Sequence, residues 1–281
     1  MTGLGNIFGV MQGRLLPKYK GRYQAHPVGY WQDEFALAAG LGLDCIEFIL
    51  DFNDAESNPL LRQDGPDEIL RATEKSSVQV RTICADYFME APIHHPAPDV
   101  GPISESVLRR LLTNGKRLGI TDIVIPCVDQ STLANDEAGQ KRFIQRLAPI
   151  LGAAEALGIN LSLETDLAPQ PFGDLLARID SSRVTVNYDI GNSAALGFDP
   201  AEELACYGKR ISDIHIKDRK LGGGSVPLGS GDARFERFFD ALKALQYTGP
   251  FIMQAFRDDE GLAIFQQQLQ WLRKNYPQVA Q

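Results

Sequence analysis

Four polar side chains with the chemistry of metal ligands stand at the ends of successive short apolar segments in the second half of the chain. They are Glu164, Asp189, His215 and Gln254. The first three follow one another at the spacing of single strand–helix repeats, and a glycine-rich loop lengthens the step to the fourth. Two carboxylates, an imidazole and an amide oxygen suit Mn²⁺, Mg²⁺ or Co²⁺, while Zn²⁺, which is also possible, favours more His or Cys. The sequence therefore predicts one divalent-metal site held by these four residues.

Charged residues follow two of these ligands closely. Lys217 and Arg219 come just after His215, and Arg257 comes just after Gln254. Such side chains either bind a sugar hydroxyl, a carboxylate or a phosphate by charge-assisted hydrogen bonds, or form a solvated rim of ion pairs. The glycine-rich segments 222–225 and 229–231 are either a phosphate-binding loop, through their backbone N–H groups, or a mobile lid.

Three further polar residues lie in the first half of the chain. Glu47 stands inside an apolar segment, where a buried carboxylate needs a partner, so a functional contact and a structural ion pair are both open. His94 and His95 are adjacent in a proline-rich loop, from which they either reach a substrate or face solvent.

The segments that carry these residues alternate between strand and helix patterns. Eight short apolar runs predict strands at Ile7–Gly13, Cys45–Leu50, Val78–Ala85, Asp122–Val128, Asn160–Glu164, Val184–Asp189, Ile211–Lys217 and Phe251–Gln254. Helical periodicity predicts helices at Trp31–Leu41, Ser104–Leu118, Glu137–Leu157, Pro200–Tyr207, Phe235–Leu245 and Gly261–Lys274, with Ser104 as an N-cap.

This alternation predicts a parallel α/β fold. A doubly wound dinucleotide-binding sheet is disfavoured, because no G-x-G-x-x-G motif follows the first strand. The number of repeats and the chain length fit a (β/α)8 TIM barrel, which we expect to form one domain over residues 1–281. Active sites of such barrels lie at the C-terminal ends of the strands, where the polar residues above occur.

The composition of the chain limits which classes of binding partner and which cellular compartment we expect. The chain has 281 residues, 36 acidic against 28 basic side chains, and a net charge of −8, so nucleic acid is not the expected partner. No segment approaches the apolar length of a membrane span, and the N-terminus lacks the pattern of a signal peptide. The four cysteines form no CxxC pair, which predicts a cytoplasmic protein whose thiols are small core residues.

At these positions the chain resembles the xylose isomerase-like TIM barrel superfamily, and more narrowly the sugar phosphate isomerase/epimerase group that includes ketose 3-epimerases. The resemblance covers nearly the whole chain, and its most specific motifs are Leu163–Thr165, Tyr188–Asn192, Ile214–Arg219 and Gly229–Gly231. It implies a divalent metal on Glu164, Asp189, His215 and residue 254. It also implies a small sugar, a sugar phosphate or a keto-polyol as substrate, and barrels of this group often form homo-oligomers.

Two positions depart from the pattern of the group. Gln254 replaces the usual glutamate of the eighth strand, and Asn192 replaces a histidine. An amide oxygen can ligate a metal but cannot accept a proton at neutral pH, so a mechanism with a carboxylate on each face of the carbon loses one base. Aldose–ketose isomerisation, which needs one base on one face, tolerates Gln254 better than epimerisation does.

The resulting hypothesis is a metal-dependent sugar isomerase or epimerase that removes a proton next to a polarised carbonyl, with Glu164 as the base. The second proton donor is expected among Glu47, His94, His95, Lys217 and a metal-bound water. His94 and Lys217 are the predicted further catalytic residues, and the predicted substrate contacts are Glu47, His95, Arg219 and Arg257. The alternatives are a lyase or dehydratase acting on a keto-polyol and a non-catalytic sugar-binding barrel. An abasic-site endonuclease on the same fold is disfavoured by the four histidines and the acidic charge.

Overall fold

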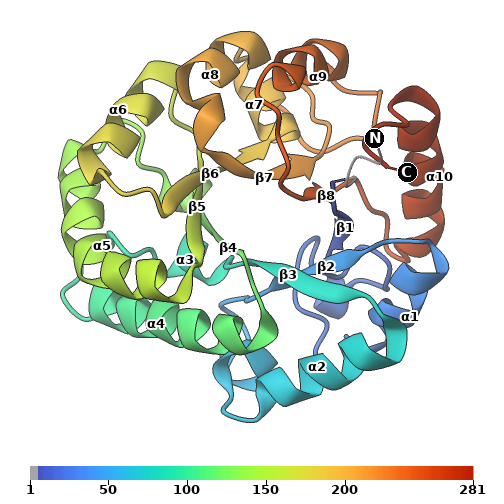
Figure 1. Ribbon diagram of the computed structural model, residues 1–281, viewed down its shortest axis with the longest axis horizontal. Helices are drawn as coiled ribbons and strands as arrows, with labels where there is room; N and C mark the ends of the chain where they lie inside the picture. Colours follow the sequence, from blue (N-terminus) through green and yellow to red (C-terminus); the bar gives the residue numbers. More distant parts are fainter. Residues whose placement is uncertain (1–5, 281) are drawn as a thin grey trace.

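The strands form a closed parallel barrel in which each strand pairs with the next and β8 pairs with β1 (Figure 1). The computed structural model describes residues 6–280. The strands are β1 (Phe8–Met11), β2 (Cys45–Ile49), β3 (Gln79–Cys84), β4 (Asp122–Cys127), β5 (Asn160–Thr165), β6 (Val184–Asp189), β7 (Ile211–Ile216) and β8 (Phe251–Met253). The predicted single-domain (β/α)8 barrel is confirmed, and each strand lies in a segment predicted to form one, except that β5 continues one residue further, to Thr165.

Helices surround the barrel and connect its strands (Figure 1). The longer ones are α1 (Asp33–Gly40), α2 (Gly65–Ser76), α4 (Val100–Leu118), α5 (Glu137–Leu157), α6 (Pro169–Ile179), α8 (Pro200–Tyr207), α9 (Phe235–Lys243) and α10 (Leu262–Asn275). Two short helices, α3 (Tyr87–Glu90) and α7 (Ile190–Leu196), start directly beyond β3 and β6. Short 3-10 turns occur at Tyr19–Gly21, Ala55–Ser57, Pro59–Leu61, Asp129–Ser131 and Gly208–Arg210.

The ends of the helices follow the local chemistry of the chain. Gly119 and Gly158 cap α4 and α5 in the left-handed conformation, with φ values of 74° and 71°. The prediction that Ser104 caps α4 is wrong, because the helix already begins at Val100. The Ser104 hydroxyl is buried and donates to the carbonyl oxygen of Ala91 at 2.7 Å, so it ties α4 to the preceding loop.

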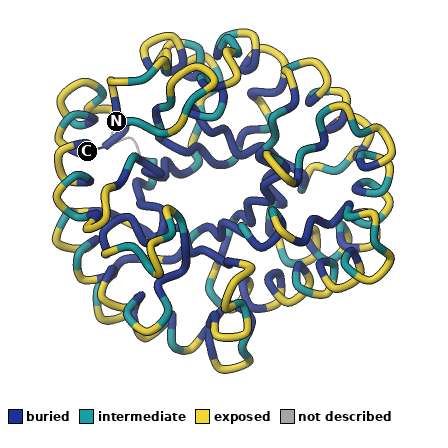
Figure 2. The backbone as a smooth tube through the Cα atoms, turned by 180° about the vertical axis from the view of Figure 1, so that it is seen from behind, coloured by how far each residue is buried: buried dark blue, intermediate teal, exposed yellow. Residues whose placement is uncertain are grey.

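Apolar side chains fill both the space between the sheet and the helices and part of the barrel interior. Figure 2 shows the strands as a buried ring, with exposed backbone on the outer sides of the helices. Cys45 and Cys84 lie inside the barrel with Met11, Ile49 and Ile252, and Cys127 is also buried, whereas Cys206 is exposed. Three of the four thiols are therefore small core residues, as predicted.

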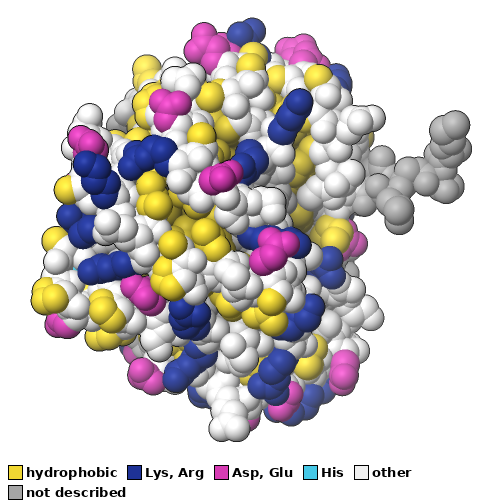
Figure 3. Space-filling model, turned by 60° about the vertical axis from the view of Figure 1, so that its left-hand side comes forward, with side chains coloured by type: hydrophobic (Ala, Val, Ile, Leu, Met, Phe, Trp, Pro, Cys, Tyr) yellow, Lys and Arg dark blue, Asp and Glu magenta, His cyan; other side chains and the backbone are white. Residues whose placement is uncertain are grey.

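The outer surface carries charged side chains of both signs. On the face shown in Figure 3, basic and acidic side chains are interspersed among polar and apolar ones. Among the described residues, no helix combines the length and the apolar character that a membrane crossing requires.

The close pairing of β1 with β2 generates a stability prediction for Gly9. A Cβ atom at this position would lie 2.4 Å from Sγ and 2.6 Å from the carbonyl oxygen of Cys45. We expect Gly9→Ala to lower the free energy of unfolding by about 1–3 kcal/mol in urea denaturation, because the barrel wall must shift to admit the methyl group. The matched control is Gly152→Ala on the surface of α5, where a Cβ meets nothing within 4 Å and stability should rise by about 0.5–1 kcal/mol. Equal stabilities of the two variants would contradict this packing.

Candidate active site

Three of the four predicted metal ligands converge at the C-terminal ends of neighbouring strands. Asp189 is the last residue of β6, Glu164 and His215 are the second-last residues of β5 and β7, and each of the three offers a ligand atom within 4.8 Å of the others. Nδ1 of His215 lies 3.7 Å from Oε2 of Glu164 and 3.9 Å from Oδ2 of Asp189. All three side chains are buried. The parallel sheet has thus placed two carboxylates beside one imidazole nitrogen.

The other nitrogen of the imidazole is held from the opposite side of the barrel. Nε2 of His215 lies 2.7 Å from Oε1 of Glu47 on β2, and both side chains are inaccessible to solvent. A proton on Nε2 is therefore donated to Glu47, which leaves Nδ1 as an acceptor, 3.1 Å from Nδ2 of Asn187 and beside Glu164 and Asp189. Glu47, Asp213 and His215 form a second group of possible metal ligands. In that group Nε2 of His215 is already engaged in the short hydrogen bond to Glu47.

Amide side chains orient the base candidate, Glu164. Asn187 donates from Nδ2 to Oε2 of Glu164 at 3.1 Å, and Asn192 donates to its Oε1. Burial raises the pKa of Glu164 to about 7, and the neighbouring Asp189 adds to the rise. A carboxyl group with such a pKa can take up and release a proton near neutral pH.

Lys217 lies beside the ligand group. Its Nζ donates to Oδ2 of Asp189 and to Oδ1 of Asn192, each at 3.2 Å. One cation therefore offsets part of the negative charge of the two buried carboxylates.

The fourth predicted ligand, Gln254, follows β8 and lines the same cavity as Glu164. Its Nε2 donates to Oε1 of Gln24 at 3.1 Å. Its Oε1 is buried and has no hydrogen-bond partner among the described residues. A buried carbonyl oxygen without a donor is a free ligand position, and a divalent cation fits a donor set of this amide, two carboxylates and an imidazole.

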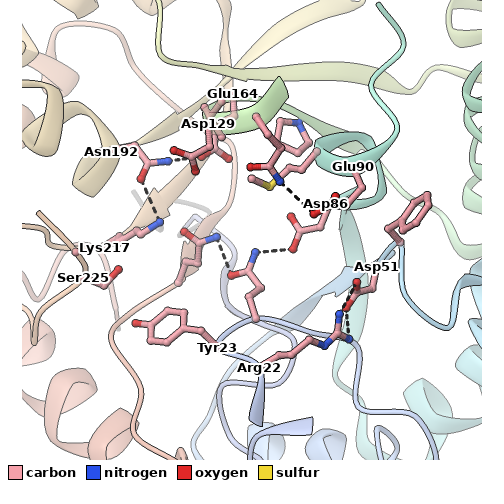
Figure 4. Close-up of a pocket in the computed structure, with 18 of the residues that line it drawn as sticks. Arg22, Tyr23, Asp51, Asp86, Glu90, Asp129, Glu164, Asn192, Lys217 and Ser225 are labelled. Atoms are coloured by element: carbon pink, nitrogen blue, oxygen red, sulfur yellow. Dashed lines mark hydrogen bonds and ion pairs between the residues drawn. The ribbon is translucent and has the colours of Figure 1, made fainter. Parts of the chain in front are cut away.

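A polar cavity of about 700 Å³ opens above these residues (Figure 4). Arg22 in its wall is neutralised by Asp51, with N–O distances of 2.8 and 2.5 Å. Arg219 instead donates to Oδ1 of Asn192 at 2.8 Å and to the carbonyl oxygen of Gly223 at 3.0 Å. No carboxylate of the described chain pairs with Arg219, so its positive charge is available to a ligand in the cavity.

The glycine-rich loop between β7 and α9 is anchored by one buried carboxylate. Asp218 accepts the backbone N–H groups of Gly229, Gly231 and Ala233 at 2.9, 2.8 and 3.1 Å. A Cβ at position 231 would lie 1.9 Å from Oδ1 of Asp218, so the close approach requires glycine. The N–H groups of Gly229 and Gly231 are therefore already used by Asp218, and the loop presents Gly224 and Ser225 to the cavity instead.

Besides the ligands Asp189 and His215, four residues with predicted catalytic or substrate-binding roles do not line the cavity. Glu47 lies behind His215, inside the barrel. The buried ring of His94 packs against Phe143, and Nδ1 of His95 accepts the N–H of Ala97.

Arg257 is the fourth of these residues. It is buried and donates to the backbone carbonyl oxygens of Gly13, Leu16, Asp258 and Asp259. Its guanidinium group therefore joins the β1–α1 loop to the β8–α10 loop.

Several cavity residues were not predicted. Arg14, Arg22 and Gln24 come from the long loop after β1, and Asp51 and Asp86 follow β2 and β3. Asp86 had an available signal, because it directly follows the third apolar run, as the predicted ligands follow theirs. The loop residues had none, because only the folded loop brings them over the barrel.

Comparisons with known proteins match both the barrel and the sequence. The xylose isomerase-like TIM barrel family matches residues 35–275. The L-ribulose-5-phosphate 3-epimerase UlaE of Salmonella paratyphi A is 26% identical over 249 residues, which cover 84% of this chain and 86% of that protein.

Solved structures show the same fold at lower identity. A D-psicose 3-epimerase structure has a TM-score of 0.74 at 16% identity and covers 95% of this chain and 98% of its own. The IOLI protein, solved with a zinc atom, has a TM-score of 0.75 at 15% identity, with coverages of 95% and 96%.

The anchoring of the glycine-rich loop predicts the effect of Asp218→Asn. We expect hydrogen exchange at the amides of Gly229, Gly231 and Ala233 to accelerate about tenfold or more, because each loses a charged acceptor worth about 1.5–3 kcal/mol. Exchange measured by mass spectrometry on the 227–235 peptide tests this. Asp240→Asn on the exposed side of α9 is the control and should leave that peptide unchanged. Unaltered exchange in Asp218→Asn would contradict the anchoring.

Proposed function

Because the chain belongs to the xylose isomerase-like TIM barrel family, we propose that it is a divalent-metal-dependent isomerase or epimerase of a small sugar or sugar phosphate. The observation that carries the proposal is the convergence of Glu164, Asp189 and Nδ1 of His215, within 4.8 Å of one another, below a polar cavity. Its volume of about 700 Å³ is sufficient for a small sugar phosphate.

In this proposal Glu164, Asp189, His215 and Gln254 hold the metal. When bound, a divalent cation polarises a substrate carbonyl and stabilises the negative charge that develops next to it. The hydrogen bond from Nε2 of His215 to Glu47 supports this ligand set, because it leaves Nδ1 unprotonated.

Glu164 acts as the general base on the carbon next to the carbonyl. Asn187 and Asn192 hold its two oxygens in fixed directions, and burial keeps its pKa close to neutral. Lys217 donates its N–H groups to substrate oxygens that lie near Asp189, where its ammonium group is already held. These contacts hold the base and the ammonium group in position before the substrate binds, so less reorganisation is needed during the reaction.

A phosphorylated ketose is the substrate class that we favour. The curated relative UlaE is named for L-ribulose 5-phosphate. In this chain Arg219 faces the cavity with neutral acceptors only, beside Ser225 of the anchored loop. A guanidinium group without a carboxylate partner is suited to bind a phosphate by charge-assisted hydrogen bonds.

Gln254 supports a second candidate function. Elimination from a keto-polyol needs one base and a metal, and the amide at position 254 removes a carboxylate from the eighth strand. A lyase or dehydratase would use the same Glu164 and the same ligand set.

The proposal predicts solvent hydrogen exchange that depends on Glu164. In deuterated water with Mn²⁺, a panel of ketoses, aldoses and their phosphates should yield an isomer or epimer with deuterium next to the carbonyl. Glu164→Gln should lower the rate by at least about 10²-fold, the usual contribution of a general base, and chelation by EDTA should abolish it. Glu236→Gln on the surface of α9 serves as the control. Elimination of water from the sugar, or cleavage of its carbon chain, would assign the lyase or dehydratase function. Absence of both deuterium exchange and turnover would contradict the proposal.

The favoured substrate class predicts a selective effect of Arg219→Ala. We expect KM for a phosphorylated ketose to rise about 10–100-fold, because a hydrogen bond to a charged group contributes about 1.5–3 kcal/mol. KM for the unphosphorylated sugar should change by less than about threefold. Steady-state kinetics on the matched pair of sugars make the comparison, and equal changes in both would argue against a phosphate contact.

A further inference from the structure

Inversion at a carbon centre requires a second acid–base group on the face opposite the first base. Gln254 cannot fill this role, because a carboxamide does not accept or release a proton near neutral pH. The cavity contains four carboxyl groups besides Glu164, which are those of Asp51, Asp86, Glu90 and Asp129. Their surroundings distinguish them.

Three of these carboxyl groups are poorly placed for proton transfer. Asp51 forms a two-point ion pair with Arg22, so both of its oxygens are already engaged by a guanidinium group. Glu90 and Asp129 are exposed at the rim, where water competes with any substrate contact. Asp86 is half-buried, and no Lys or Arg of the described chain lies within ion-pair distance of it.

The immediate partners of Asp86 are neutral. Nε2 of Gln24 donates to its Oδ2 at 2.8 Å, and Sγ of Cys84 donates to its Oδ1 at 3.2 Å. Burial raises the pKa of Asp86 above the usual range of an aspartate. The group can therefore exist as a carboxylic acid that donates a proton and as a carboxylate that accepts one.

Gln24 connects Asp86 to the position from which the usual glutamate is missing. Oε1 of Gln24 accepts from Nε2 of Gln254 at 3.1 Å and from Nη2 of Arg14 at 2.7 Å, while its Nε2 donates to Asp86. The amide of Gln24 is thus fixed with its oxygen toward residue 254. A glutamate at 254 has no N–H to donate and would place a carboxylate against that oxygen.

We propose that Asp86, at the end of β3, is the second catalytic acid–base group of this site, and that Gln254 and Gln24 orient it. This inference rests on the proposed function. Asp86 from β3 and Glu164 from β5 both extend into the cavity (Figure 4).

In the proposed reaction Glu164 removes one proton from the substrate carbon and Asp86 returns another. The Glu164 carboxylate takes the proton from the carbon next to the carbonyl, and the C–H electron pair moves toward the carbonyl oxygen. The Asp86 carboxylic acid then gives its proton to the opposite face of the same carbon, and the carbonyl forms again. Glu164 ends protonated and Asp86 ionised, and exchange with water restores the starting state.

Isotope exchange separates the two groups. The probe is whichever ketose or ketose phosphate of the panel the wild type converts, assayed in deuterated water with Mn²⁺. In Asp86→Asn we expect product formation to fall by at least about 10²-fold, while Glu164 continues to exchange the substrate hydrogen for deuterium. Glu164→Gln should lose both exchange and product. Gln254→Glu should form less product than the wild type, because it breaks the orientation of Gln24.

Matched measurements exclude a merely structural effect. Asp129→Asn is the control carboxyl variant, because asparagine tolerates the left-handed backbone found there, with φ of 50°. It should retain product formation within about threefold. Mn²⁺ affinity by calorimetry and the midpoint of thermal unfolding should be unchanged in Asp86→Asn.

Four results would overturn the inference. Product formation by Asp86→Asn within about threefold of the wild type would exclude a catalytic role, as would a parallel loss of exchange and product. Increased activity of Gln254→Glu would assign the second acid to position 254. Absence of exchange by the wild type on every sugar would remove the proposed function as well, so the two failures are distinguishable.

Discussion

The site depends on the burial of two carboxylates, Glu164 and Asp189, beside one imidazole nitrogen. Each charge would cost several kcal/mol in this environment if it lacked a partner. Asn187 and Lys217 supply hydrogen bonds and one positive charge, but both oxygens of Glu164 are held only by amides. In the proposed function a divalent cation completes the compensation, and this requirement would explain why polar side chains occupy the ends of strands whose other residues are apolar.

Hydrogen bonds from the barrel interior hold the buried charged groups of the site in place. His215 is fixed between the carboxylates above it and Glu47, which reaches it from β2 across the interior. The same principle operates at the rim, where Asp218 binds three backbone amides and holds the glycine-rich loop beside Arg219. Buried carboxylates therefore have two roles here. In the proposed function those beside the cavity take part in the reaction, whereas those with saturated hydrogen bonds act as structural anchors.

The extent to which the site was predictable follows from the geometry of parallel strands. Glu164, Asp189 and His215 could be found because the C-terminal ends of neighbouring strands must meet, whatever the loops do. Arg257 could not be placed, because its partners are carbonyl oxygens of a loop at the opposite end of the chain. Glu47 was recognised as needing a partner, but only closure of the barrel identifies it as His215. Gln24 and Arg14 carry no local signal, since their roles arise from the path of the loop after β1.

Gln254 in place of a glutamate changes the number of negative charges in the ligand group. With a glutamate there, as in the resembling ketose 3-epimerases, the ligand group would contain three carboxylates, and Lys217 and a dication would together balance them. With Gln254 the ligand group contains two carboxylates, and a further acid, Asp86, follows β3 instead. The number of carboxyl groups around the cavity is then retained, but one of them no longer competes for the metal. A carboxyl group that is not a metal ligand can bind and release a proton without leaving a metal, which is the property that a second acid–base group requires.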